Sequence, residues 1–278
     1  MSVISPGSVD LSGFIDMHVH SAPDVRPRSL DDVEVARGAV AAGLAGVLIK
    51  SHVTITADRA AIAERVVPGV RVFGGVALNH AVGGLNPAAV EAAIKLGARE
   101  VWLPTFSARG AAGAPGGISV VDADGRLVPT ALEVLKLVAD AGVILGTGHL
   151  SVPEIVLVVR QARRLGIRKV LVTHPEASLV AMPVDVQREL ADEGAWFERC
   201  YVGTLGAASA LTVADIARQI RAVGPASTVI STDLGQEGNP LPWDGFRAYA
   251  AGLLANGISP DEVRLMAAEN PARLLDLK

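Results

Sequence analysis

The chain has 278 residues, of which 50% are hydrophobic and 19% charged, and 25 basic against 29 acidic residues give a formal net charge of −4. This balance lacks the basic surface that nucleic acids and anionic membranes attract, so we expect neither class of partner. The single cysteine, Cys200, excludes an internal disulfide framework and fits a reducing compartment. Residues 1–6 lack the pattern of a signal peptide, and no apolar stretch reaches the roughly eighteen residues of a membrane helix, so we expect a cytoplasmic globular protein.

Short apolar runs alternate with amphipathic stretches along the chain. Eight runs have the length and composition of β-strands, at residues 14–19, 46–50, 70–77, 100–103, 143–146, 169–173, 195–198 and 228–232. Apolar residues at three- and four-residue spacing predict helices between them, for example at residues 30–42, 87–96, 130–141, 152–165 and 183–193. Eight strand–helix repeats in a chain of this length predict a single (β/α)₈ TIM-barrel domain over residues 1–278.

One segment interrupts this repeat after the fourth strand. Residues 107–119 are rich in glycine and alanine, and Asp124-Gly125 in the segment that follows is a strong signal for a two-residue hairpin turn. We therefore expect an inserted glycine-rich loop and a hairpin. They would form either a mobile cover over the top of the barrel or a solvent-exposed decoration.

The histidines are concentrated where predicted strands end. His18 and His20 end the first strand, and because side chains two residues apart project to the same face, the two imidazoles can converge on one metal ion. Other polar residues at or just after strand ends are Lys50, His52, His80, His149, His174 and Asp233. The carboxyl ends of barrel strands surround one cavity, and none of the histidines falls inside a predicted helix, so we expect several of them to serve one site.

The residue types in this set favour a divalent metal. Neutral imidazoles with a carboxylate, and without a cysteine cluster, suit Zn²⁺, Mn²⁺, Fe²⁺ or Co²⁺, with zinc as the expected ion. Such an ion lowers the pKa of bound water from near 16 toward about 7, which gives hydroxide at neutral pH. Asp233 could then take a proton from that water and pass it to a leaving group.

The strand-end residues resemble a known family. The run Phe14-Ile15-Asp16-Met17-His18-Val19-His20, followed in order by His149, His174 and Asp233, is similar to the amidohydrolase superfamily of metal-dependent hydrolases. The tail at residues 269–277 also resembles the closing helix of that superfamily. The resemblance implies that His18 and His20 bind a first metal ion, that His149 and His174 bind a second, and that Asp233 is both a ligand and the catalytic base.

The chain departs from the superfamily pattern at one position. Many members with two metal ions carry a bridging carboxylated lysine or glutamate at the end of strand four, where this chain has only Trp102-Leu103-Pro104-Thr105. Lys50, at the end of strand two, is the nearest substitute, and we expect it to be a carboxylated bridging ligand. Its alternative roles are a cationic substrate anchor and a metal-free general base. If Lys50 is not a bridge, a site with one metal ion is favoured.

Four residues are candidates for substrate binding. Arg26 and Arg28 follow the first strand and could clamp a carboxylate or phosphate, although loop arginines are more often solvated. His52 shares a strand face with Lys50, and His80 follows the third strand. Either histidine could contact the substrate or only hydrogen-bond a loop.

Together these features predict an enzyme whose metal-bound hydroxide attacks an amide, cyclic amide, lactone or ester bond of a small molecule. A metal-dependent decarboxylase or phosphoesterase in the same cavity is the alternative reaction class, because the ligands generate the nucleophile while the loops select the substrate. A barrel that binds a small anionic ligand without turnover is the alternative outside enzymes. The apolar composition is compatible with a homo-oligomer, although no stripe of residues identifies an interface.

Overall fold

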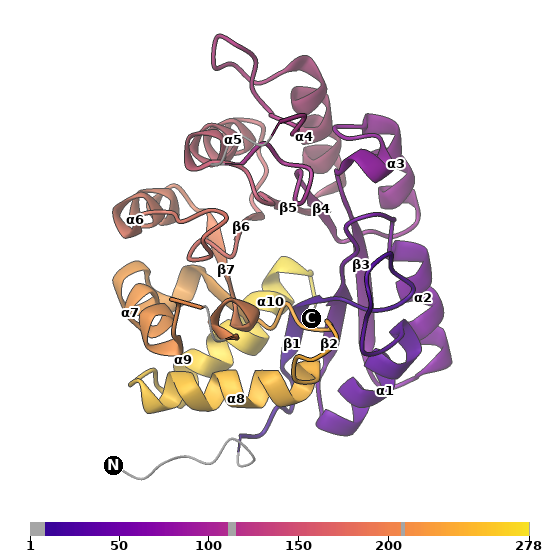
Figure 1. Ribbon diagram of the computed structural model, residues 1–278, viewed down its shortest axis with the longest axis vertical. Coiled ribbons are helices and arrows are strands. Elements are labelled where there is room, and N and C mark those ends of the chain that lie inside the picture. Colours follow the sequence, from indigo (N-terminus) through magenta and orange to yellow (C-terminus); the bar gives the residue numbers. More distant parts are fainter. Residues whose placement is uncertain (1–8, 111–114, 207–208, 278) are drawn as a thin grey trace. The chain divides into compact units, whose positions relative to one another are not determined.

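The computed structural model describes residues 9–110, 115–206 and 209–277, so part of the predicted glycine-rich loop lies outside the described residues. Strands and helices alternate along these ranges (Figure 1). The strands are β1 (Ile15–Val19), β2 (Gly46–Ile49), β3 (Arg71–Ala77), β4 (Glu100–Trp102), β5 (Ile144–Gly146), β6 (Val170–Thr173), β7 (Trp196–Cys200) and β8 (Thr228–Ser231). All eight predicted strands are confirmed, with small shifts at their ends.

Helices alternate with the strands, and several of them have recognisable caps. They are α1 (Asp32–Ala42), α2 (Ala57–Val66), α3 (Pro87–Lys95), α4 (Pro129–Ala141), α5 (Val152–Arg164), α6 (Val184–Asp192), α7 (Val213–Val223), α8 (Pro242–Ala255), α9 (Pro260–Arg264) and α10 (Asn270–Leu274). Helix α1 starts with a capping box, in which Asp31 and Glu34 each accept a hydrogen bond from the other's backbone N–H. It ends at Gly43, whose φ of 84° suits glycine. No helix within the described ranges is long and apolar enough to cross a membrane.

The strands form one parallel sheet in the order β1-β2-β3-β4-β5-β6-β7-β8. Just beyond β8, Leu234 forms a parallel bridge with Val19 of β1, so the last strand returns to the first. Parallel neighbours in chain order, connected through helices, are the topology of a (β/α)₈ barrel. The predicted fold class is therefore confirmed.

The chain divides into two compact units, and β3 and β7 contribute residues to both. The first unit comprises residues 1–50, 59–73 and 198–278, and the second comprises residues 51–58 and 74–197. The single domain expected over residues 1–278 stays a prediction.

In the first unit, β1 separates an apolar core from a polar face. Val19 packs in a cluster of buried residues with Val35 of α1, Ile49 of β2 and Phe246 of α8. The alternate residues of β1 and its end are Asp16, His18 and His20, and they are also buried. Because the strand is buried on both faces, the apolar side holds it in place while the other side presents polar groups to the interior.

In the second unit, β4, β5 and β6 pair in parallel, and the insertion follows β4. Within the insertion, Val121 and Leu127 form an antiparallel bridge on either side of the turn that contains Asp124-Gly125. Ser119 donates a hydrogen bond of 2.7 Å to Glu154 in the first turn of α5. This contact ties the base of the insertion to the helix.

Candidate metal centre

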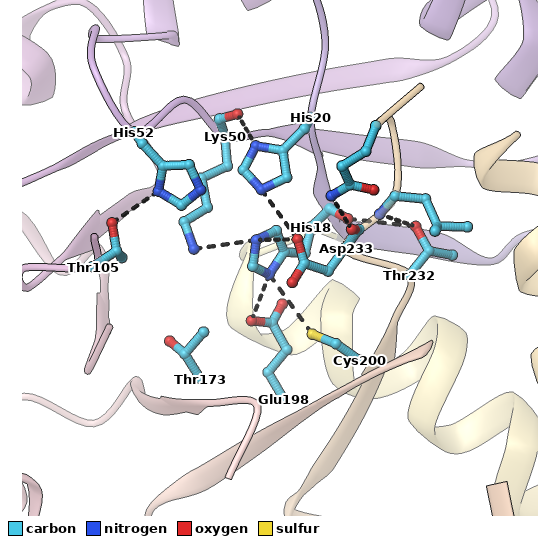
Figure 2. A network of polar contacts seen from close by, with 12 residues as sticks. His18, His20, Lys50, His52, Thr105, Thr173, Glu198, Cys200, Thr232 and Asp233 are labelled. Carbon is cyan, nitrogen blue, oxygen red and sulfur yellow. Dashed lines mark hydrogen bonds and ion pairs between the residues drawn. The ribbon is translucent and has the colours of Figure 1, made fainter. Parts of the chain in front are cut away.

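Three side chains of the first unit converge on a small region. His18 Nε2 lies 3.2 Å from Asp233 Oδ1, and His20 Nε2 lies 3.1 Å from the same oxygen. Figure 2 shows both imidazoles directed toward this carboxylate. The two-residue spacing predicted that His18 and His20 share a face, and in the first unit both imidazoles do lie on one face, next to the same oxygen of Asp233.

A backbone hydrogen bond places Asp233 next to the two histidines. Asp233 follows β8, and its N–H donates a hydrogen bond of 2.8 Å to the carbonyl oxygen of His18. Its φ is 54°, in the left-handed region that residues other than glycine adopt rarely and that is enriched at functional sites. The conformation therefore points to a functional constraint on this residue.

The hydrogen bonds of the two imidazoles determine which nitrogen faces Asp233. His18 Nδ1 lies 3.1 Å from Glu198 Oε2, and His20 Nδ1 lies 2.9 Å from the carbonyl oxygen of Lys50. Both partners are acceptors, so each imidazole donates from Nδ1 and carries a lone pair on Nε2. Two Nε2 lone pairs and a carboxylate oxygen thus face one another.

Burial keeps these histidines neutral. It lowers the pKa of His18 to about 3 and that of His20 to about 4, although Asp233 acts in the opposite direction on both. Neutral imidazole is the form that binds metal ions. Two imidazole lone pairs and a carboxylate oxygen repel one another unless a positive charge lies among them, and either a metal ion or the Lys50 side chain next to His18 Nε2 can supply that charge.

The distances within this group also suit a metal ion. The three ligand atoms lie within 4.8 Å of one another. With bonds of about 2.0–2.1 Å, neighbouring ligand atoms in a tetrahedral zinc site are about 3.3–3.4 Å apart, close to the separations of 3.1 and 3.2 Å from Asp233 Oδ1. The donor set therefore fits a divalent ion.

Asp16 connects β1 to the segment that carries Asp233. Its carboxyl group accepts hydrogen bonds from the backbone N–H of Thr232 (3.0 Å), the hydroxyl of Thr232 (2.6 Å) and the backbone N–H of His18 (3.3 Å). Burial raises the pKa of Asp16 to about 7, against the effect of the hydrogen bonds from Thr232. Because Thr232 directly precedes Asp233, the hydrogen bonds between Asp16 and Thr232 help to position Asp233.

Lys50 lies at the end of β2, where the sequence suggested a bridging ligand. Its side chain is buried, and Nζ lies 3.1 Å from His18 Nε2 (Figure 2). An ammonium group at this position donates to the lone pair that a metal ion would need. A metal at His18 therefore requires Lys50 to move or to change chemically.

Glu198 and Cys200, two residues apart on β7, both face His18. Cys200 Sγ lies 3.7 Å from His18 Nδ1, the nitrogen that also contacts Glu198. Glu198 is the last residue of the strand predicted at residues 195–198, but the sequence did not predict its contact with His18. Their two-residue spacing, which gives both side chains one face, was the available signal.

The second unit brings together three of the predicted histidines. His149 follows β5, His174 follows β6, and their ring centroids are 4.9 Å apart. His52 lies 6.3 Å from His149 by the same measure. His174 has a φ of 27°, in the left-handed region, as Asp233 has. The predicted sharing of one site by these histidines with His18 and His20 stays a prediction.

The other candidates for substrate binding have structural partners. Arg28 donates to Asp24 from Nε (3.0 Å) and Nη2 (2.8 Å), and this ion pair is buried, whereas Arg26 is exposed. The side chain of His80, which opens a short 3₁₀ turn, contacts the carbonyl oxygen of Gly116 at 3.1 Å. Substrate binding by Arg26, Arg28 and His80 stays a prediction, and for His80 the loop contact is the observed one.

Solved structures with the same fold are enzymes of several kinds. An amidohydrolase from Pseudomonas aeruginosa matches with a TM-score of 0.67 and 15% identity, covering 98% of each chain. A probable dipeptidase from the same organism matches with a TM-score of 0.68 and 12% identity, covering 94% of each chain. A 2,6-dihydroxybenzoate decarboxylase matches with a TM-score of 0.58 and 13% identity, over 96% of this chain and 100% of the other.

These likenesses confirm the resemblance to the amidohydrolase superfamily at the level of the fold. No curated protein matches the sequence. The family model described as a family of unknown function, DUF6282, matches residues 13–198. This match covers more than half of the chain, which therefore belongs to the DUF6282 family.

Proposed function

We propose that this protein is a metal-dependent hydrolase and that His18, His20 and Asp233 hold its divalent ion, with zinc as the expected metal. The bond to be cleaved is an amide, cyclic amide, lactone or ester of a small molecule. The observation that carries the proposal is the convergence of two neutral Nε2 atoms and one carboxylate oxygen at 3.1 and 3.2 Å. A divalent ion bound there supplies Lewis-acid activation of water and of a carbonyl oxygen.

The protein residues around this site have separable tasks. Glu198 accepts the Nδ1 proton of His18 and so directs its Nε2 lone pair inward, as the carbonyl oxygen of Lys50 does for His20. Asp233 would hold a proton in transit from the attacking water to the leaving group. The fold similarity to a probable dipeptidase supports this reaction class.

For Lys50 we propose carboxylation of Nζ. A carbamate would replace a cation that competes for the His18 Nε2 lone pair with oxygen atoms that can bind the metal. Growth or dialysis in ¹³C-bicarbonate tests this: a carbamate signal in the carbon NMR spectrum of the zinc-loaded protein is expected and should be lost in Lys50→Met. A spectrum without that signal would leave the cationic roles of Lys50.

A second metal position is proposed at His149 and His174, whose imidazoles lie close together in the second unit. Elemental analysis of the zinc-loaded wild type, His149→Ala and His174→Ala tests it. Two ions per chain, falling to one in each variant, are expected. One ion per chain in all three proteins would restrict the metal site to His18, His20 and Asp233.

The proposed activity is tested with metal-free protein and a panel of lactones, esters, cyclic amides and dipeptides. Turnover is expected only after addition of Zn²⁺, Mn²⁺, Fe²⁺ or Co²⁺, and Asp233→Asn is expected to abolish it. Glu237→Gln is the matched control, because it makes the same carboxylate-to-amide change at an exposed residue of the segment after β8. Full activity in metal-free protein would refute the proposal.

Decarboxylation is the second candidate, because the fold is shared with a decarboxylase of an aromatic acid. Lewis-acid activation of a carboxylate and proton transfer by Asp233 would serve that reaction too. Release of CO₂ from aromatic carboxylic acids, without hydrolysis of any ester or amide in the panel, would favour it over the hydrolase.

A further inference from the structure

A hydrogen-bond network in the second unit surrounds His52 and starts from a fixed asparagine. Asn79 Oδ1 accepts from the backbone N–H groups of Thr105 (2.9 Å) and Ser107 (3.0 Å). Asn79 Nδ2 donates to the carbonyl oxygen of His52 at 2.9 Å. Since backbone donors and acceptors cannot exchange roles, these three bonds define which end of the amide is oxygen.

The orientation of Asn79 sets the direction of the next bond. Asn79 Nδ2 also donates to Thr105 Oγ1 at 2.6 Å, so this oxygen acts as an acceptor there. A hydroxyl group has one proton to donate. Among the residues that the structure describes, the acceptor within reach of that proton is His52 Nδ1, at 2.8 Å (Figure 2). The Thr105 hydroxyl therefore donates to His52.

This direction determines the tautomer of His52. A ring nitrogen that accepts a hydrogen bond carries no proton, so the neutral imidazole of His52 has its proton on Nε2. His18 and His20 have the opposite tautomer, because their Nδ1 atoms face acceptors. The hydrogen-bond networks thus distinguish His18 and His20, whose Nε2 carries a lone pair, from His52, whose Nε2 carries the proton.

The ring of His52 is held in place as well as in tautomer. Phe106 stacks on it, with centroids 3.8 Å apart and planes inclined by 31°. His52 and Thr105 are buried, whereas Phe106 is 49% exposed, so the imidazole lies under an aromatic ring at the surface of the unit. Both the plane of the imidazole and the nitrogen that carries its proton are therefore determined before any ligand arrives.

We propose that Asn79 and Thr105 are positioning residues that hold His52 as the neutral Nε2–H tautomer, and that His52 donates a hydrogen bond to a carbonyl or carboxylate oxygen of a substrate bound in the second unit, beside the proposed metal position at His149. The substrate contact rests on the proposed function, whereas the tautomer does not. A donor whose direction is set in advance stabilises negative charge on that oxygen without reorganising.

Nitrogen NMR of protein labelled with ¹⁵N-histidine reads the tautomer directly. In metal-free protein at neutral pH, His52 is expected to show an unprotonated Nδ1 and a protonated Nε2, with its signals identified by their absence in His52→Gln. A protonated Nδ1 in the wild type would overturn the assignment. The measurement requires neither a substrate nor bound metal.

Variants of the two positioning residues test the relay. Thr105→Val removes the hydroxyl donor and is expected to shift the tautomer ratio toward Nδ1–H by up to about tenfold, whereas Thr105→Ser keeps the wild-type ratio. The carboxylate in Asn79→Asp can only accept, so the Thr105 hydroxyl should turn toward it and His52 should then donate from Nδ1. If Asn79→Asp fails to fold, the two Thr105 variants decide, and equal ratios in both would refute the relay.

Kinetics with a substrate from the hydrolase panel test the contact itself. Thr105→Val is expected to lower kcat/KM by about tenfold at unchanged metal content, and Thr105→Ser to restore it. An altered tautomer with unchanged kcat/KM would overturn the substrate contact alone. If no panel member is turned over, the hydrolase proposal fails while the NMR result still decides the tautomer.

Discussion

Replacing Glu198 with glutamine should weaken metal binding without changing the shape of the site. The variant keeps an oxygen acceptor for His18 Nδ1 and removes one negative charge, 3.1 Å from that nitrogen. Both side chains are 1% exposed, so solvent hardly screens the interaction. A carboxylate on the far nitrogen makes an imidazole a better ligand, and such partners contribute roughly 10- to 100-fold to metal affinity, or about 1.4–2.7 kcal/mol.

Competition with a chromophoric chelator measures the zinc affinity of the metal-free wild type and of Glu198→Gln. The matched control is Glu237→Gln, which removes the same charge from an exposed residue in the segment after β8. We expect the control to bind zinc as the wild type does. Unchanged affinity in Glu198→Gln, with its fold intact by circular dichroism, would refute the role of the carboxylate in metal binding.

Two further predictions concern the pH dependence of stability and the room for a side chain at two glycines. Burial lowers the pKa of His18 to about 3 and that of His20 to about 4, from 6.5, so the unfolded chain protonates both histidines before the folded chain does, and the free energy of unfolding declines as the pH falls. Burial also raises the pKa of Asp16 from 3.8 to about 7, so here the folded chain takes up the proton first, which offsets part of that decline. The free energy of unfolding of metal-free Asp16→Asn, measured with urea, should therefore fall by about 1.4 kcal/mol more than that of the wild type as the pH is lowered from about 6 to 5. Equal slopes of the two proteins against pH would contradict these shifts. A Cβ on Gly235 (φ 122°) would lie 1.7 Å from the His20 carbonyl oxygen, whereas one on Gly238 (φ 84°) meets no atom within 4 Å. Gly235→Ala should therefore cost about 3 kcal/mol or more of unfolding free energy and Gly238→Ala about 1–2, and equal losses would show that the clash is relieved at no cost.

The strands and the common face of His18 and His20 could be predicted from the sequence because both depend on local patterns. Apolar runs identified the strands, and parallel strands in chain order place their carboxyl ends at one end of the sheet. The two-residue spacing of His18 and His20 gave them one face. The contacts of Lys50 and Asp233 with His18 agree with this reasoning.

The partners of these residues could not be predicted, because they depend on side-chain direction across strands distant in sequence. Glu198 contacts a residue 180 positions away, and nothing in its own strand indicates which neighbour it faces. Asn79, whose amide directs the network at His52, precedes the more conspicuous His80. The pairing of Arg28 with Asp24 had a local signal, their four-residue spacing, which would have shown that this arginine has a partner.

Equilibrium dialysis against Zn²⁺, followed by elemental analysis, tests the metal site most directly. The wild type is expected to retain at least one tightly bound ion per chain, and His20→Ala and Asp233→Asn are expected to lose the ion that these residues share with His18. A wild-type protein that retains no zinc, or variants that retain as much as the wild type, would contradict a metal centre at this position.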